Sequence, residues 1–397
     1  MIGFKMDIPR DVEFIINRLE AGGYHANVVG GAVRDSLISR PLGDFDITTD
    51  ATPEEIKAVF ADLRTIDTGI KHGTVTVVID HTPYEITTYR IDGDYKDNRH
   101  PDFVTFTRSL GEDLKRRDFT VNAMAYNPRE GLTDLFGGVD DAKNRIVRAV
   151  GDAKVRFDED ALRILRGLRF SSVLGFDIED KTAEAIREKA SLLSGVSSER
   201  IYQELKKLLL GSSASRTLRG FADTLSLCLG GVEARDYPTD EELLGASLST
   251  RFALVFLLNS DSPIVAAERA FDLLKADNST RSATKGALLA YERVDFSERS
   301  AILHSLADCG RDDVYGALAL GLTTGRFTIA DKERLDSVMA DDPVYTVAHL
   351  ALGGHDLAAL GYRGRAIGEA LGILLNAVID GKCENTKDAL IGYLRNA

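Results

Sequence analysis

The stretch from Ala26 to Arg34 constrains the fold of this chain more than any other. An apolar run, Ala26 to Val29, predicts a strand that ends at Gly30-Gly31, and the residues that follow predict a helix beginning near Ala32. Glycines let the backbone approach a ligand, and the start of a helix offers unpaired N–H groups to an anion. Arg34 adds a planar guanidinium that suits phosphate oxygens. The stretch therefore predicts a phosphate-binding turn between a strand and a helix.

A second strand is predicted a few residues later, over 44–48. The run Asp44-Phe45-Asp46-Ile47-Thr48 alternates polar and apolar residues, which places Asp44 and Asp46 on one face of a half-buried strand. Two adjacent carboxylates repel each other, so a bound cation is the natural reason for the pair. Oxygen ligands suit Mg²⁺, and a pair of such ions supports in-line attack at phosphorus. Either motif alone is more often a plain turn or a solvated strand edge, but both together favour a nucleotide site.

Taken together, 30–35 and 43–47 resemble the signature of the nucleotidyltransferase superfamily that includes DNA polymerase β. More narrowly, they resemble the class II tRNA nucleotidyltransferases and their bacterial poly(A) polymerase relatives. The resemblance implies that Gly30, Gly31 and Arg34 bind nucleotide and that Asp44 and Asp46 hold Mg²⁺. In that superfamily a neighbouring strand supplies a third carboxylate.

Local patterns predict the elements around these motifs. Residues 11–21 are amphipathic and predict a helix, and Thr52-Pro53-Glu54-Glu55 predicts a capped helix start that runs to about Leu63. Strands are predicted over 73–79 and 84–89. Glu85 lies on the second of these strands and is the candidate third carboxylate. An equally good interpretation is that Glu85 is a strand-face carboxylate that has its hydrogen-bond partners and holds no metal.

A basic run is followed by a carboxylate at Lys115-Arg116-Arg117-Asp118. Arginine binds phosphate, while a carboxylate accepts hydrogen bonds from ribose hydroxyls. Alone, such a run is usually a solvated charge cluster. The run from Arg116 to Ala123, however, matches the second motif of the same family. This resemblance implies that Arg117, Asp118 and Asn122 bind the nucleotide, with Asp118 reading the 2′-hydroxyl.

One long helix is predicted over 152–174, and the simplest explanation of its charged residues is an intrahelical salt-bridge ladder. Within this predicted helix, the pattern Glu159-Asp160-Ala161-Leu162-Arg163 resembles the family's Glu-Asp-x-x-Arg element, which acts as a protein template. A carboxylate beside a guanidinium presents an acceptor and a donor together, as a base edge does. The resemblance implies that Asp160 and Arg163 read C or A. The residues that would complete this part of the pocket are Glu159, Arg166 and Arg169.

The segment 92–101 is polar and bounded by turn formers, which predicts a loop. In CCA-adding relatives a flexible loop at this place helps the change from CTP to ATP, and CC-adding relatives lack it. Its presence favours addition of the complete triplet.

Composition limits the other possibilities. A net charge of −13 argues against a protein that coats nucleic acid through bulk positive charge, so RNA binding needs a local basic patch. The three cysteines are far apart and offer neither a zinc spacing nor a disulfide framework. We find no signal peptide and no long apolar run, so a cytoplasmic location without a membrane partner is expected.

The sequence as a whole predicts an α/β (α+β) nucleotidyltransferase head with a small mixed β-sheet, followed by an all-α neck, body and tail. The expected boundaries are 1–145 for the head, 146–210 for the neck, 211–310 for the body and 311–397 for the tail. The resemblance implies a monomer or homodimer that adds CCA to tRNA from CTP and ATP without a nucleic-acid template. A poly(A) polymerase and a partial enzyme that adds only CC or only A remain open. A non-catalytic RNA-binding relative would need a lost carboxylate or arginine, and none is lost.

Overall fold

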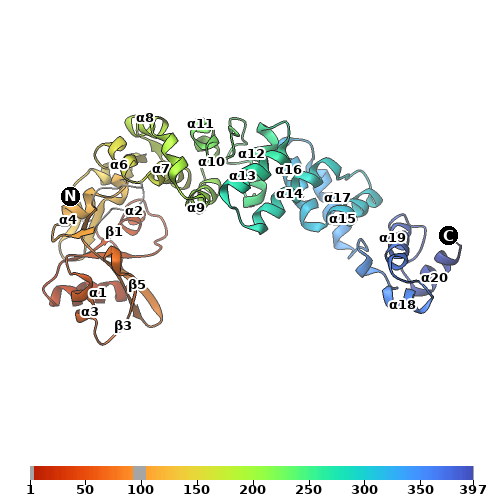
Figure 1. The fold of residues 1–397 in the computed structure, drawn as a ribbon, viewed down its shortest axis with the longest axis horizontal. Helices are drawn as coiled ribbons and strands as arrows, with labels where there is room; N and C mark the ends of the chain where they lie inside the picture. The colour runs from red at the N-terminus through yellow and green to blue at the C-terminus, as the bar shows by residue number, and fades with distance from the viewer. Residues whose placement is uncertain (1–3, 93–103, 397) are drawn as a thin grey trace. The chain divides into compact units, whose positions relative to one another are not determined.

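The computed structural model describes residues 4–92 and 104–396, so residues 93–101 of the predicted loop lie outside the described part. The chain forms two compact units, Met1–Gly231 and Val232–Ala397. In Figure 1 the first unit runs from red to green and the second from green to blue. Each unit is described separately below.

A mixed seven-stranded sheet forms the base of the first unit, as the sequence predicts. Its strand order is β3-β4-β5-β2-β1-β8-β9, and only the β2–β5 pair is parallel. The strands are β1 (Ala26–Val29), β2 (Asp46–Thr49), β3 (Arg64–Gly69), β4 (Thr74–Ile79), β5 (Thr82–Thr88), β8 (Met124–Asn127) and β9 (Gly131–Asp134). Two short two-stranded sheets accompany it, formed by β6 (Arg90–Asp92) with β7 (Val104–Phe106) and by β10 (Ile146–Val147) with β11 (Asp177–Ile178).

Strand β1 lies inside the sheet, and all four of its residues are buried. It pairs with β2, so that Val29 stands opposite Asp46, and with β8 on its other side. The prediction that Asp44 belongs to β2 was wrong, because the strand begins at Asp46. The reason is that β1 ends opposite Asp46 and then turns at Gly30, which leaves the residues before Asp46 without a pairing partner.

Helices cover the sheet and continue beyond it within the first unit. They are α1 (Arg10–Ala21), α2 (Gly31–Leu37), α3 (Pro53–Val59), α4 (Leu110–Lys115), α5 (Gly138–Asn144), α6 (Ala153–Glu159), α7 (Leu162–Leu174), α8 (Asp180–Glu188), α9 (Ser198–Leu209), α10 (Ala214–Gly220) and α11 (Ala222–Ser226). Helices α1 and α3 pack together, and their buried residues Ile15, Ile16 and Ile56 join the apolar core of the sheet. The predicted capping box of α3 is confirmed by reciprocal hydrogen bonds between Thr52 and Glu55. This helix ends at Val59, earlier than expected, because the chain then turns into β3.

The prediction of one helix over 152–174 was wrong, because the chain breaks between α6 and α7. Asp160 has extended backbone angles, φ −138° and ψ 104°. Its side chain accepts a hydrogen bond from the N–H of Leu162 at 3.0 Å, which offers the backbone an alternative to a continuous helix. This break places Asp160 outside both helices.

Among the residues that the structure describes, the second unit contains helices joined by turns and loops and no strands. Its helices are α12 (Leu248–Asn259), α13 (Pro263–Leu274), α14 (Asn278–Arg293), α15 (Arg299–Cys309), α16 (Arg311–Thr324), α17 (Ile329–Ala340), α18 (Gly354–Ala359), α19 (Arg365–Ile379) and α20 (Lys387–Asn396). Phe252 and Phe256 each meet Phe271 edge to face, with ring centroids 5.2 and 5.8 Å apart, in the apolar interior. Within the described ranges, none of the helices has the length and apolar character needed to cross a membrane.

Tight packing at the start of α5 gives a test of the fold. A Cβ on Gly138 would lie 2.2 Å from the backbone oxygen of Thr120 and 2.8 Å from Cγ of Met124. We expect Gly138→Ala to lower the free energy of unfolding by about 1–3 kcal/mol, because the overlap can be relieved only by moving backbone. Urea unfolding of the full chain measures this. The control is Gly195→Ala, whose added Cβ would meet no described heavy atom within 4 Å; equal losses in the two variants would contradict this packing.

Candidate active site

The glycine turn between β1 and α2 brings the first two motifs together. Gly30 has φ 72° and ψ −128°, a conformation that residues with a Cβ rarely adopt. A Cβ at this position would lie 3.4 Å from Nη1 of Arg117 and 4.0 Å from Oδ2 of Asp46. The turn therefore lies directly beside a carboxylate of β2 and an arginine that follows α4.

A hollow of about 310 Å³ opens at this turn. Its wall combines residues from the turn, from β2, from the segment after α4 and from the start of α7. The sequence-predicted residues that line it are Gly30, Asp46, Arg117, Asp118, Asn122, Asp160, Arg163 and Arg166. Three further lining residues were not among the predicted site residues: Arg116, Leu162 and Arg200. The structure thus brings most of the expected nucleotide-binding residues to one place.

Asp113 on α4 supports this wall from behind and was missed by the sequence analysis. Its side chain is completely buried, and it accepts hydrogen bonds from Arg116 at 2.8 and 3.0 Å and from Arg117 at 3.3 Å. Burial alone would raise the pKa of the Asp113 carboxyl, but the two arginines outweigh burial and hold the pKa below its usual value. The spacing of Asp113 from the arginines, three and four residues, was a signal that could have revealed the role.

Asp118 is a second buried carboxylate, and it lines the hollow itself. Its Oδ1 accepts hydrogen bonds from the N–H of Phe119 at 2.8 Å and from Nδ2 of Asn122 at 3.3 Å. Its Oδ2 accepts a hydrogen bond from Nε of Arg166 at 2.7 Å. Burial would raise the pKa of Asp118, but Arg166 and then Arg163 reverse the effect and lower it to about 2. The carboxylate is therefore ionised and joins its segment to α7.

Arg34 does not line the hollow, although its sequence position suggested a phosphate-binding fork. It is buried and forms a two-point ion pair with Asp35, at 2.9 and 3.0 Å. It also donates to Oδ1 of Asn122 at 2.7 Å. These contacts tie the first turn of α2 to the Asn122 segment, so the observed role of Arg34 is to fix the two motifs relative to each other. The other predicted residues outside the lining of this hollow are Gly31, Asp44, Glu159 and Arg169.

The salt-bridge explanation of the α6–α7 segment holds for Glu159. Glu159 pairs with Arg156 and Arg163, three and four residues away. Arg163 also donates to the backbone oxygens of Arg156, at 3.1 Å, and Arg116, at 2.9 Å. Arg163 therefore lines the hollow as a buried and firmly held guanidinium.

The other charged residues of this segment pair with distant parts of the chain. Asp160 accepts from Arg200 of α9 at 3.0 Å, in addition to the N–H of Leu162. Arg169 lies 2.7 Å from Glu204 of α9, and its guanidinium lies over the ring of Phe170 at 4.0 Å. These residues thus join α7 and the break before it to α9, and they do not form a ladder along one helix.

The carboxylates predicted to hold metal lie at a second hollow of about 520 Å³. Asp44, Asp46 and Glu85 line it, and Asp46 borders both hollows. Strands β2 and β5 run parallel with Ile47 beside Ile86, so Asp46, at the start of β2, stands beside Glu85 in the middle of β5. Removal of water by the surrounding protein raises the pKa of Asp46, and repulsion from Asp44 adds to this, while Arg117 opposes it.

This donor set fits a divalent cation, because carboxylate oxygens are hard ligands and positive charge would relieve the repulsion between Asp44 and Asp46. Across residues 4–92 and 104–396, no three His, Cys, Asp or Glu side chains are placed to hold one metal ion together. The geometry therefore supports Asp44 and Asp46 as the two carboxylates that could hold a cation. Glu85 is a neighbour of this pair.

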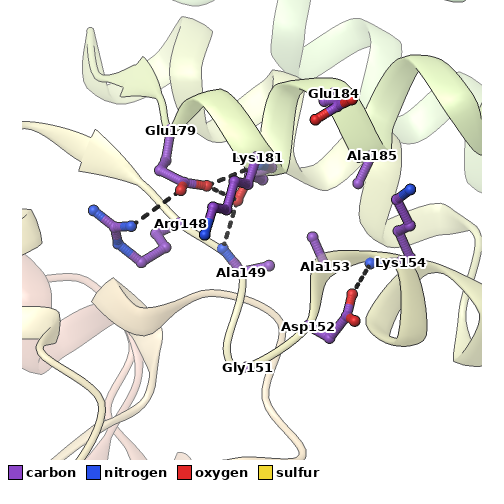
Figure 2. A pocket seen from close by; sticks show the side chains of 11 residues that line it. Arg148, Ala149, Gly151, Asp152, Ala153, Lys154, Glu179, Lys181, Glu184 and Ala185 are labelled. Carbon is purple, nitrogen blue, oxygen red and sulfur yellow. Dashed lines mark hydrogen bonds and ion pairs between the residues drawn. The ribbon is translucent and has the colours of Figure 1, made fainter.

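A larger hollow, of about 660 Å³, lies away from these residues, between β10, α6 and α8. Figure 2 shows Arg148 directed toward Glu179 at this hollow; the two form an ion pair at 3.2 Å. Lys154 pairs with Glu188 close by. Because the charges at this hollow largely neutralise one another and no predicted site residue lines it, we assign the chemistry to the two hollows that share Asp46.

Comparison with known proteins gives matches along most of the chain. The family model described as "Poly A polymerase head domain" matches residues 26–148, and the model described as "Probable RNA and SrmB- binding site of polymerase A" matches residues 175–225. A model of tRNA nucleotidyltransferase domain 2 matches residues 249–394.

Individual relatives match over nearly the full length. The CCA-adding enzyme of Geobacillus stearothermophilus is 39% identical over 403 residues, which cover 96% of this chain and 95% of that protein. That of Lactobacillus helveticus is 36% identical over 394 residues, 96% of each chain. Among solved structures, the Bacillus stearothermophilus CCA-adding enzyme in complex with CTP is 34% identical and superposes with a TM-score of 0.83 over 98% of each chain.

The lowered pKa of Asp118 predicts how stability depends on pH. Since the pKa is lower in the folded chain, about 2 against 3.8 for the ordinary group, ionised Asp118 stabilises the fold at neutral pH. This contribution, about 2 kcal/mol, is complete above the unfolded pKa and is lost as pH falls through the folded pKa. Between about pH 6 and about pH 3 the wild type should lose about 1 kcal/mol more unfolding free energy than Asp118→Asn.

Urea unfolding at both pH values measures this difference, and Asp118→Asn is the reference because it removes only the titrating group. An identical pH dependence in the two proteins would contradict the ion pair with Arg166.

Proposed function

Because the chain belongs to the CCA-adding enzymes, we propose that it adds C, C and A in turn to the 3′ end of tRNA from CTP and ATP and releases pyrophosphate. The observation that carries this proposal is the single hollow in which the glycine turn, Asp46, Arg117 and Asp160 meet. The reaction needs a site for the phosphates, a catalytic carboxylate and a group that reads the base. The glycine turn with Arg117, Asp46 and Asp160 would supply these three parts for one bound nucleotide.

We propose that Mg²⁺ is the metal, held by Asp44 and Asp46, with Glu85 as a candidate third ligand. When bound, the ions supply the positive charge that activates the attacking hydroxyl and steadies the leaving pyrophosphate. Asp46 borders both hollows, so the nucleotide would lie on one side of it and the tRNA 3′ end on the other. This arrangement suits in-line attack, because attacking and leaving oxygens must lie on opposite sides of the phosphorus.

The phosphates and sugar would be bound by groups that the fold already holds in place. Gly30 and Gly31 let the backbone of the turn approach the triphosphate, and Arg117, anchored by Asp113, binds its oxygens. Asp118 would accept a hydrogen bond from the ribose 2′-hydroxyl, since three protein donors leave part of its acceptor capacity free. Four further residues would hold these groups in place through hydrogen bonds and ion pairs around the hollow: Arg34, Asn122, Arg166 and Arg169.

Base selection would depend on Asp160 as acceptor and Arg163 as donor, with Glu159 holding Arg163. Cytosine and adenine both present an amino donor beside a ring-nitrogen acceptor, whereas uracil and guanine present the reverse order. A fixed carboxylate and guanidinium therefore accept C and A and reject U and G. No nucleic-acid template is needed for this choice.

We propose that the head spans 1–145, the neck 146–210, the body 211–310 and the tail 311–397. The strands of the seven-stranded sheet all precede residue 145, and α9 ends at Leu209, which supports the first two boundaries. The helical tail would bind tRNA. We place the enzyme in the cytoplasm, where its tRNA and nucleotide substrates occur.

Product sizing tests the proposed activity. tRNA transcripts that end at the discriminator base, at CC and at CCA are incubated with Mg²⁺ and labelled CTP, ATP or both. We expect growth by three nucleotides, by one A and by nothing, respectively. Long A tails, a stop after CC, or addition of only the A would instead support a poly(A) polymerase or a partial enzyme with the same site.

Removing a catalytic carboxylate tests the metal assignment. Asp46→Asn should lower incorporation by about a thousandfold, because it removes a charged ligand from the proposed metal pair. Binding of the tRNA transcript, measured by filter retention, should stay unchanged. Glu54→Gln, an exposed carboxylate on α3, is the control, and full activity in Asp46→Asn would exclude this metal site.

A further inference from the structure

The carboxylate of Asp160 is held from two sides. Its Oδ1 accepts from the N–H of Leu162 at 3.0 Å, and its Oδ2 accepts from Nη2 of Arg200 at 3.0 Å. In the break between α6 and α7, the backbone N–H of Asp160 donates to the oxygen of Arg156 and its backbone oxygen accepts from Arg163. These bonds hold the backbone, while the carboxylate is held by Leu162 and Arg200. Its orientation in the hollow therefore depends on these two donors.

Arg200 comes from a different element and borders the same hollow. It lies in the first turn of α9, forty residues after Asp160, and it lines the hollow together with Asp160 and Arg163. Its second terminal nitrogen, Nη1, is buried and has no hydrogen-bond partner among the described residues. Buried N–H groups are rarely left unpaired, so a ligand that fills the hollow is the natural acceptor for Nη1.

The arginine predicted to partner Asp160 is held elsewhere. Arg163 pairs with Glu159 and donates to two backbone oxygens, and its ion pair is with Glu159 and not with Asp160. The acceptor and the donor for a base edge are thus fixed by two separate partners, Arg200 for Asp160 and Glu159 for Arg163. The position of the acceptor relative to the donor therefore depends on Arg200 as well as on Glu159.

From this geometry we propose that Arg200 is a positioning residue for base selection, which acts by fixing the Asp160 carboxylate in the orientation that accepts the amino group of C or A. The inference rests on the proposed function. Without Arg200, Asp160 keeps only the N–H of Leu162 and turns about its Cβ–Cγ bond. The site then no longer prefers the amino group of C or A over the carbonyl oxygen that uracil carries at the same position.

Kinetics of single-nucleotide addition test this proposal, with the full chain, Mg²⁺, a tRNA transcript and CTP, ATP or UTP. Arg200→Met keeps the length of the side chain but removes the charge. We expect it to raise KM for CTP and ATP about tenfold, to change kcat less than about threefold, and to lower the preference for CTP over UTP about tenfold. Arg200→Lys keeps a donor for Asp160 and should recover most of the preference.

Lys207→Ala is the matched control, because Lys207 is an exposed cation on the same helix. The ratio of CTP to UTP efficiency is independent of how much protein is folded, so it separates selection from stability. An unchanged ratio in Arg200→Met, or an equal loss in Arg200→Lys and Arg200→Met, would overturn the inference. Failure of the wild type to add C or A would instead overturn the proposed function itself.

Discussion

The architecture of the site depends on buried charges that must be paired. A guanidinium or carboxylate taken out of water is tolerated only when an opposite charge and hydrogen bonds replace the lost solvent. Two of the pairs join separate elements, because Asp118 holds Arg166 of α7 and Asp160 meets Arg200 of α9, while Asp113 of α4 holds Arg116 and Arg117 directly after the same helix. The ion pairs therefore fix these segments against one another and, in the same contacts, orient the groups that line the hollow.

The sheet contributes the other half of the site through its strand order. Because β1 pairs with β2 in the middle of the sheet, the glycine turn that follows β1 lies beside Asp46 at the start of β2. Asp46 borders a basic hollow on one side and a hollow with Asp44 and Glu85 on the other. One strand end thus stands between the place proposed for the nucleotide and the place proposed for the tRNA terminus.

Sequence patterns predicted those parts of the structure that depend on interactions between residues close together in the chain. The strand and turn at Gly30, the capping box at Thr52 and the mixed sheet followed by helices were all predictable from periodicity and side-chain chemistry. The break at Asp160 was not, because it depends on a hydrogen bond that this side chain accepts from the backbone N–H of Leu162 and on a partner forty residues away. Burial was not predictable either: Arg34, interpreted from its position as a phosphate ligand, is buried against Asp35 and Asn122, and Asp113 is buried behind Arg116 and Arg117.

The central claim is that protein groups alone choose the base, and equilibrium binding of nucleotides to the wild-type chain tests it most directly. Calorimetric titration with CTP, ATP, UTP and GTP in the presence of Mg²⁺, without any RNA, measures the four affinities. We expect CTP and ATP to bind at least about tenfold more tightly than UTP and GTP, because only they match the acceptor and donor order of Asp160 and Arg163. Equal affinity for all four nucleotides would contradict the account.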